Sequence, residues 1–191
     1  GYKDVKEKSV IAKFKVKNTE NEYFLAWTTT PWTLPSNVAL CVNPEETYLK
    51  LRISKDDKIE KYILAEALKD LIEDEYEIEE TYSGKELEYM EYEPLFDYVT
   101  TDKKAYYVTC DNFVTLTDGT GIVHIAPAFG DDDSKVGREY DLPFIQLVDG
   151  KGEFKAEARD LAGMFCKDAD KLIISMLNDK GLLFNVQKYE H

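Results

Sequence analysis

The chain has 191 residues, of which 43% are hydrophobic, and a formal net charge of −14. This composition indicates a globular domain with a buried core and excludes a disordered chain. The charge argues against tight, nonspecific binding of nucleic acid by the chain alone, because phosphate contacts need basic groups.

The acidity is concentrated in one segment. Residues 56–102 contain 17 acidic and 4 basic residues, whereas the rest of the chain contains 21 acidic and 20 basic residues. We expect this segment to present a solvated face. No apolar stretch approaches the roughly 20 residues that a membrane-spanning helix needs, and the first ten residues lack the apolar core of a signal peptide.

The three cysteines, Cys41, Cys110 and Cys166, lie far apart in the sequence. An odd number without a close pair argues against a disulfide framework and against a structural zinc site. A reducing, cytoplasmic compartment is therefore expected.

Most predicted elements are strands, because short runs of alternating apolar and polar residues recur along the chain. On the first of them, Val10, Ala12, Phe14 and Val16 share one face. In chain order, the predicted strands are 9–17, 22–28, 38–42, 47–53, 61–65, 75–92 (a hairpin turning at Ser83–Gly84), 104–110, 112–117, 143–154 (with a turn at Gly150 and Gly152) and 182–190.

Three helices are predicted, at residues 66–74, 131–142 and 167–181. Asp168 is expected to cap the last helix and Gly181 to end it. Strands mostly follow strands, which disfavours a βαβ-type parallel sheet. The pattern instead predicts a β-rich barrel or folded sheet with peripheral helices.

Two polar clusters interrupt this pattern. The first is "TTTPWTLP", residues 28–35, with three consecutive hydroxyls and two prolines. It is either an ordinary strand end followed by a turn, since threonine suits strands and proline ends them, or the lining of a small polar pocket.

The second cluster spans residues 118–133 and contains His124 in "IVHIAP" and the triplet "DDD". A satisfied core histidine and a helix N-terminus would explain both features structurally. A metal site of His124, Asp131 and Asp133 is disfavoured, because it lacks a third strong ligand of known spacing. The nucleophile elbow, the P-loop and the dinucleotide-binding motif are all missing.

Together, the two clusters resemble a known family. "WTTTPWTLPSN" (27–37) and "GTGIVHIAPAFGDDD" (119–133) are similar, in order and separation, to the two signature stretches of the isoleucyl-tRNA synthetase editing domain. "YKDVKEKSVIAKFKV" and "NVQKYEH" resemble the family's entry into the domain and its exit, so the resemblance covers the whole chain. Thr30 and His124 stand where the valyl and leucyl editing domains usually carry other residues, which favours the isoleucyl family.

The resemblance implies a fold and a role. The fold is β-rich (all-β or α+β), with a distorted Greek-key β-barrel core and a few peripheral helices. Residues 1–191 would form a single editing domain of a larger synthetase, in which misacylated valyl-tRNA(Ile) is hydrolysed and isoleucine is excluded. No cofactor is expected in this domain, since ATP would be used by the synthetase's catalytic domain.

The resemblance also assigns site residues. Thr30, His124 and Asp133 would be catalytic: Asp133 anchors the α-ammonium of the substrate, and His124 forms the wall that rejects isoleucine. Thr28 and Thr30 would contact the valyl side chain and position the water or ester oxygen, with Thr29 in support. The implied substrate-binding residues are Thr28, Thr29, Thr30, Asn37, His124 and Asp133; Asn37 is a weaker member of this set, as is Trp32.

Two other functions remain open. The chain could be a non-catalytic module that presents the tRNA 3′ end, or a free-standing hydrolase of another small ester or amide. Its expected partners are the 3′ end of a misacylated tRNA, its valine moiety and the rest of the synthetase, with no membrane.

Overall fold

The computed structural model describes residues 6–190, with side chains for residues 9–187. Nine strands of this part form one mixed sheet. The strands are β1 (Lys6–Lys15), β2 (Glu22–Thr28), β3 (Ala39–Val42), β4 (Thr47–Lys55), β5 (Lys58–Ala65), β6 (Glu77–Ser83), β7 (Tyr107–Cys110), β8 (Ile122–Ile125) and β9 (Leu183–Glu190).

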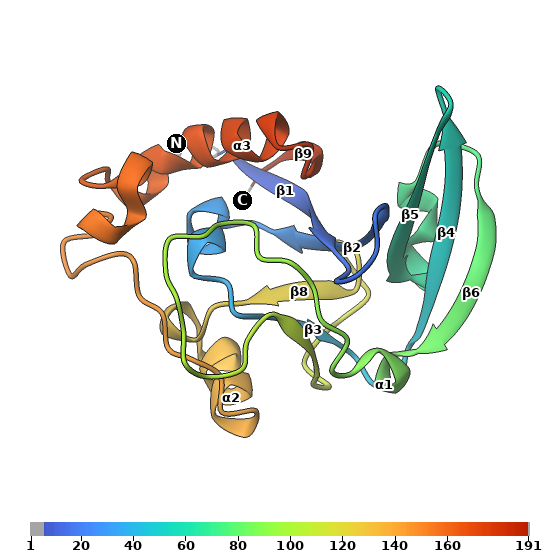
Figure 1. Cartoon of the computed structure of the whole chain (residues 1–191), viewed down its shortest axis with the longest axis horizontal. Coiled ribbons are helices and arrows are strands. Elements are labelled where there is room, and N and C mark those ends of the chain that lie inside the picture. Colours follow the sequence, from blue (N-terminus) through green and yellow to red (C-terminus); the bar gives the residue numbers. More distant parts are fainter. Residues whose placement is uncertain (1–5, 191) are drawn as a thin grey trace.

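The sheet is curled into a half-barrel. Its strand order is β6-β4-β5-β2-β8-β3-β7, and β1 pairs with both β2 and β9. β2 runs parallel to β5 and β8, and β3 runs parallel to β7, whereas the other pairs are antiparallel. In Figure 1, β4, β5 and β6 form a wing on the right of the molecule, and α2 lies at the lower left. The β-rich prediction is confirmed.

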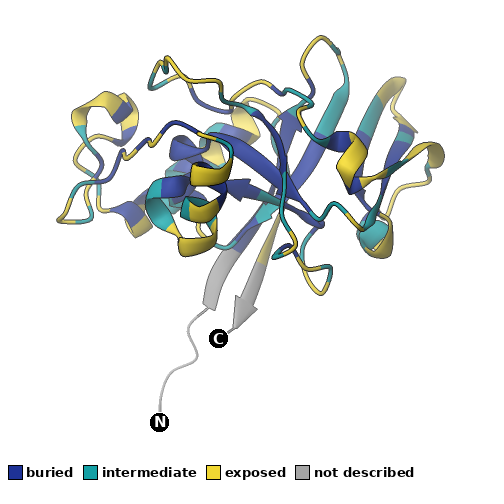
Figure 2. Cartoon of the chain, turned by 90° about the horizontal axis from the view of Figure 1, so that it is seen from below, coloured by how far each residue is buried: buried dark blue, intermediate teal, exposed yellow. Residues whose placement is uncertain are grey.

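The alternation of β1 separates two cores. Val10, Ala12 and Phe14 face the larger core, as predicted, while Ile11 points the other way into a smaller core with Leu25. Both faces of β1 are therefore buried, and Figure 2 shows the central strands dark blue while the surrounding loops are mostly exposed. Such double burial fixes the register of β1, because a slip by one residue would exchange the two faces.

Two of the three predicted helices are confirmed, as α2 (Asp131–Glu139) and α3 (Asp170–Asp179). Gly181 ends α3 with a φ of 72°, a left-handed conformation that glycine adopts without strain. Asp168 is not the cap: it lies in the short 3₁₀ helix η5 (Cys166–Ala169), which leads directly into α3. Residues 66–74 form only the 3₁₀ helix η2 (Glu66–Leu71). In the described part of the chain, no helix has the length and apolar character needed to cross a membrane.

The predicted hairpin at Ser83–Gly84 is wrong. Ser83 instead caps the one-turn helix α1 (Gly84–Leu87) in a capping box with Glu86. A Cβ on Gly84 would lie 1.9 Å from the carbonyl oxygen of Asn43, so this glycine is required by close backbone approach and not by a turn.

Two further strand predictions fail, and one strand was missed. Residues 112–117 are irregular, and residues 143–154 contribute isolated bridges, among them Val148 to Phe154. β8 was not predicted, because its residues lie within the segment 118–133, which was interpreted as a polar cluster. The remaining short helices are η1 (Pro31–Ser36), η3 (Pro127–Phe129) and η4 (Ala156–Leu161).

Candidate active site

The three consecutive threonines lie where β2 ends and η1 begins. Thr28 is the last residue of β2 and is buried, whereas Thr30 precedes η1 and is exposed. The Thr30 N–H donates to Thr28 Oγ1 at 3.1 Å, and Pro31 then fixes the first turn of η1. A rigid strand end therefore presents the Thr30 hydroxyl to solvent.

A line of hydroxyls runs inward from that point. Thr30 Oγ1 lies 3.4 Å from Thr28 Oγ1 and 3.3 Å from Thr33 Oγ1. Thr33 is buried, and its hydroxyl donates to the Thr30 carbonyl at 2.9 Å. Thr29 is half-buried and makes none of these bonds in the described structure, which is consistent with alternation along an extended segment.

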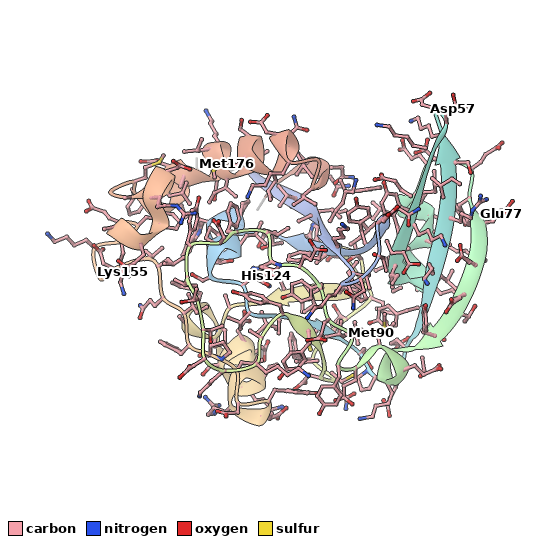
Figure 3. All side chains as sticks on the ribbon, in the orientation of Figure 1. Asp57, Glu77, Met90, His124, Lys155 and Met176 are labelled. Carbon is pink, nitrogen blue, oxygen red and sulfur yellow. The ribbon has the colours of Figure 1, made fainter. Side chains whose placement is uncertain are left out.

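His124 continues this line into the protein. It lies on β8, opposite Leu40 of β3, and Figure 3 shows it at the centre of the molecule. Its Nε2 lies 2.8 Å from Thr33 Oγ1, and its Nδ1 lies 3.4 Å from Asn37 Nδ2. Burial disfavours the charged imidazolium and lowers the pKa of His124 to about 4.

The partners of His124 determine its tautomer. Because the Thr33 hydroxyl gives its proton to a backbone carbonyl, it accepts the Nε2–H of His124. The Asn37 amide donates to the Ala39 carbonyl at 2.8 Å and also faces Nδ1, which must therefore be an acceptor. His124 is thus a neutral Nε2–H donor with both ring nitrogens engaged, and it is not poised to act as a general base.

Asn37 is itself held by a residue that the sequence did not indicate. The buried hydroxyl of Tyr92 donates to Asn37 Oδ1. The two residues are 55 positions apart, and no motif in the sequence links them. Thr33, by contrast, lies within the hydroxyl-rich stretch, although it was not assigned to the site.

Asp133 lies in the first turn of α2, beside the end of β8. Its Oδ2 accepts the backbone N–H of Ala126 at 2.9 Å. Burial raises the pKa of Asp133, and the backbone N–H groups of Ala126 and of Asp133 itself oppose that shift. A Cβ on Gly130 would lie 3.0 Å from Asp133 Oδ1, so the absence of a side chain there gives the carboxylate room.

The structure thus brings most of the expected site residues together. Thr28, Thr30, Asn37 and His124 belong to one hydrogen-bonded network, and Asp133 is tied to the strand of His124 through Ala126. Trp32 packs edge-on against Phe129 with ring centroids 5.2 Å apart, and so links η1 to η3.

The donors are not arranged for a metal. Within residues 6–190, no three His, Cys, Asp or Glu side chains are grouped so that they could hold one. Asp131 is exposed, and both ring nitrogens of His124 already have partners. The network offers preorganised hydroxyls and a fixed imidazole, and the Asp133 carboxylate is bonded to the backbone just past the end of β8.

Comparison with known proteins identifies the family. The family model described as "Leucyl-tRNA synthetase, editing domain" matches residues 5–190. An isoleucine–tRNA ligase of Clostridium acetobutylicum is 51% identical over 100% of this chain, which is 18% of that protein. An isoleucine–tRNA ligase of Bacillus thuringiensis is 45% identical over 100% of the chain, again 18% of that protein. The chain therefore spans about a fifth of these relatives.

Solved structures share the fold. The crystal structure of GlLeuRS-CP1 superimposes with a TM-score of 0.71 at 15% identity, covering 94% of this chain and 98% of that chain. The editing domain of the P. knowlesi cytosolic leucyl-tRNA synthetase gives 0.70 at 14% identity, covering 100% and 99%. At this identity the likeness concerns the fold, whereas the family follows from the match over residues 5–190. The resemblance to the isoleucyl editing domain is confirmed, and the chain belongs to the family of aminoacyl-tRNA synthetase editing domains.

Proposed function

We propose that this domain, acting as a single unit over residues 1–191, hydrolyses the ester of valyl-tRNA(Ile) and spares isoleucyl-tRNA(Ile). The observation that carries the proposal is the neutral, doubly held His124 at the inner end of a hydroxyl line that opens to solvent at Thr30. Identity to isoleucine–tRNA ligases over the whole chain supports the isoleucyl parent.

Such a site would complement the aminoacylation site of the parent synthetase. A pocket built for a larger apolar side chain rejects one that is a methylene smaller by only about 10- to 200-fold, a range established with synthetases of this kind. A second site that admits valine but not isoleucine removes the error. The edge of His124 is suited to this task, because it is fixed on both nitrogens and cannot swing away from an extra methylene.

Each of the other residues has a role in this reaction. Asp133 anchors the α-ammonium by a charge-assisted hydrogen bond. Thr28 and Thr30 contact the valyl side chain and orient the ester and the attacking water, while Thr29 supports the strand end. Asn37 acts on the substrate through His124. Hydrolysis of an activated ester needs mainly this orientation.

The proton acceptor in this proposal belongs to the tRNA and not to the protein. His124 is a donor at Nε2 and is engaged at Nδ1, so the free hydroxyl of the terminal adenosine is the base that we propose. A tRNA that lacks this hydroxyl should be deacylated far more slowly by the domain. Unchanged deacylation of that tRNA would show that the base lies elsewhere.

The proposed activity implies specific partners and a compartment for the domain. The domain would receive the 3′ end of the misacylated tRNA, carrying valine, from the rest of the synthetase in the cytoplasm, without a membrane. It would need no cofactor, and ATP would serve the catalytic domain of the parent enzyme.

Deacylation of valyl-tRNA(Ile) and isoleucyl-tRNA(Ile) tests the function. We expect the chain to hydrolyse only the valyl ester and Asp133→Ala to lose this activity. Asp132→Ala is the matched control, because Asp132 is an exposed neighbour on the same helix. Equal activity of Asp133→Ala and Asp132→Ala would refute the assignment of Asp133.

The same assay separates the alternatives. A free-standing hydrolase would turn over small valyl esters without tRNA at a comparable rate. A non-catalytic module would bind valyl-tRNA but stay inactive even within the full-length synthetase.

A further inference from the structure

Tyr92 reaches the site from a distant part of the chain. Its ring is buried and packs edge-on against Phe14 at 5.2 Å. Its backbone N–H donates to the carbonyl of Tyr106 at 2.9 Å, and the residue forms an isolated bridge with Val16. These contacts fix the hydroxyl, which donates to Asn37 Oδ1.

The hydrogen bonds of the Asn37 amide have a direction. Its NH₂ group donates to the Ala39 carbonyl and to Nδ1 of His124, and its oxygen accepts a hydrogen bond from the Tyr92 hydroxyl. The direction continues outward, because His124 Nε2–H donates to Thr33, which donates to the Thr30 carbonyl. The orientation of the Asn37 amide is therefore linked to the proton positions on Tyr92, His124 and Thr33.

The opposite direction of these hydrogen bonds is chemically conceivable. If the amide turned over, Oδ1 would face Nδ1, His124 would become an Nδ1–H donor, and the Thr33 hydroxyl would donate to Nε2. Two groups oppose this reversal. The Ala39 carbonyl would meet an oxygen instead of an NH₂, and the phenolic proton of Tyr92 would lose its acceptor.

We propose that Tyr92 is a positioning residue of the editing site: its hydroxyl orients the Asn37 amide and thereby keeps His124 in the Nε2–H tautomer that forms the wall of the pocket. The effect on substrate choice rests on the proposed function, whereas the effect on the tautomer does not. Tyr92 is buried and would act on the substrate only through Asn37 and His124.

Imidazole ¹⁵N spectra of the ¹⁵N-histidine-labelled chain at neutral pH test the tautomer directly, since the chain has only two histidines. In the unmodified protein, His124 should show one protonated and one pyridine-like nitrogen. Tyr92→Phe keeps the ring and removes the hydroxyl, so Asn37 Oδ1 loses its donor. We expect the two ¹⁵N shifts of His124 to move toward each other, as in a mixture of tautomers.

Tyr48→Phe is the matched control. It also removes a buried hydroxyl, but one that contacts only backbone, the Gly121 carbonyl at 2.6 Å and the Asn43 N–H at 2.9 Å. This variant should keep the His124 spectrum of the unmodified protein. Unchanged His124 shifts in Tyr92→Phe, or equal changes in both variants, would overturn the proposal.

Substrate choice gives a second readout. Tyr92→Phe should reduce the ratio of valyl to isoleucyl deacylation by about tenfold, the usual scale for losing one buried hydrogen bond, while Tyr48→Phe should not. An unchanged ratio in Tyr92→Phe would overturn the role in substrate choice. If the unmodified sequence deacylates neither tRNA even within the full-length synthetase, the proposed function fails, and the spectra still decide the role of Tyr92.

A second variant tests the proposal independently in case Tyr92→Phe does not fold. Asn37→Asp keeps an acceptor for Tyr92 but has no N–H for Nδ1, so His124 should become an Nδ1–H donor. Retention of the Nε2–H tautomer in Asn37→Asp would equally refute the proposal.

Discussion

At the scale of single residues, the site depends on a histidine that stays neutral. His124 is 9% exposed, and its pKa falls from 6.5 to about 4 on burial. The unfolded chain therefore binds a proton at this residue below pH 6.5, while the folded chain does not. The contribution of His124 to the free energy of unfolding must then fall as the pH drops from about 6.5 toward 4.

The size of this effect can be measured. Between pH 7 and 4.5 we expect His124 to account for a loss of about 2–3 kcal/mol in the free energy of unfolding. Urea unfolding of the unmodified chain and of His124→Gln isolates it, because the carboxylates titrate in both proteins. Parallel pH profiles for the two proteins would contradict a depressed pKa.

Gly130 makes room for the carboxylate of Asp133. The Cβ of Gly130→Ala would lie 3.0 Å from Asp133 Oδ1 and displace it from Ala126. We expect a loss of deacylation of about tenfold to a hundredfold, the scale seen for small misplacements in active sites. Gly150→Ala is the control, since nothing lies within 4 Å of its Cβ. Equal rates for the two variants would show that the position of this carboxylate does not matter.

At the scale of elements, the acidic segment proves to be more than a solvated face. β6 carries mostly exposed side chains, as expected of a charged edge strand. The residues that follow it turn inward, however, and Leu87, Tyr92 and Leu95 are buried in the larger core. The junction at α1 redirects the chain toward the site.

That junction depends on close packing at Gly84. Gly84→Ala places a Cβ 1.9 Å from the Asn43 carbonyl oxygen, so the backbone must move. We expect a loss of about 3 kcal/mol in the free energy of unfolding. Ser83→Ala, which removes only the cap, should cost about 1 kcal/mol. Urea midpoints will rank the two variants, and a cost for Gly84→Ala no greater than that for Ser83→Ala would contradict this account.

At the scale of the whole molecule, charge limits what the domain can do alone. A net charge of −14 disfavours binding of the proposed tRNA substrate, so under the proposed function the affinity would come from the site and from the rest of the synthetase. Between 50 and 200 mM salt, a protein with many phosphate contacts loses about 10³–10⁵ in affinity.

The isolated domain should behave differently. We expect its KM for valyl-tRNA(Ile) to change by less than about tenfold over this range, because few counterions are released on binding. Deacylation kinetics at several salt concentrations will measure the dependence. A steep rise in KM would indicate a cationic tRNA surface that the charge distribution does not suggest.

The sequence alone determined the β-rich class, the strands β1 and β2, the helices α2 and α3, and two motifs that specify the family. These features are local, since periodicity, end signals and contiguous motifs are encoded within a few neighbouring residues. Predictions were wrong where tertiary contacts override local pattern, as at Gly84, where the Asn43 backbone forbids a side chain.

Only the tertiary structure decided how the candidate site is built. From the sequence, the three consecutive threonines were also consistent with an ordinary strand end, and His124 with an ordinary core residue. The three-dimensional fold joins them through Thr33 and supports Asn37 with Tyr92 across 55 residues. No local rule could predict that contact, because hydrogen-bond direction and burial arise only when distant segments close around the same imidazole.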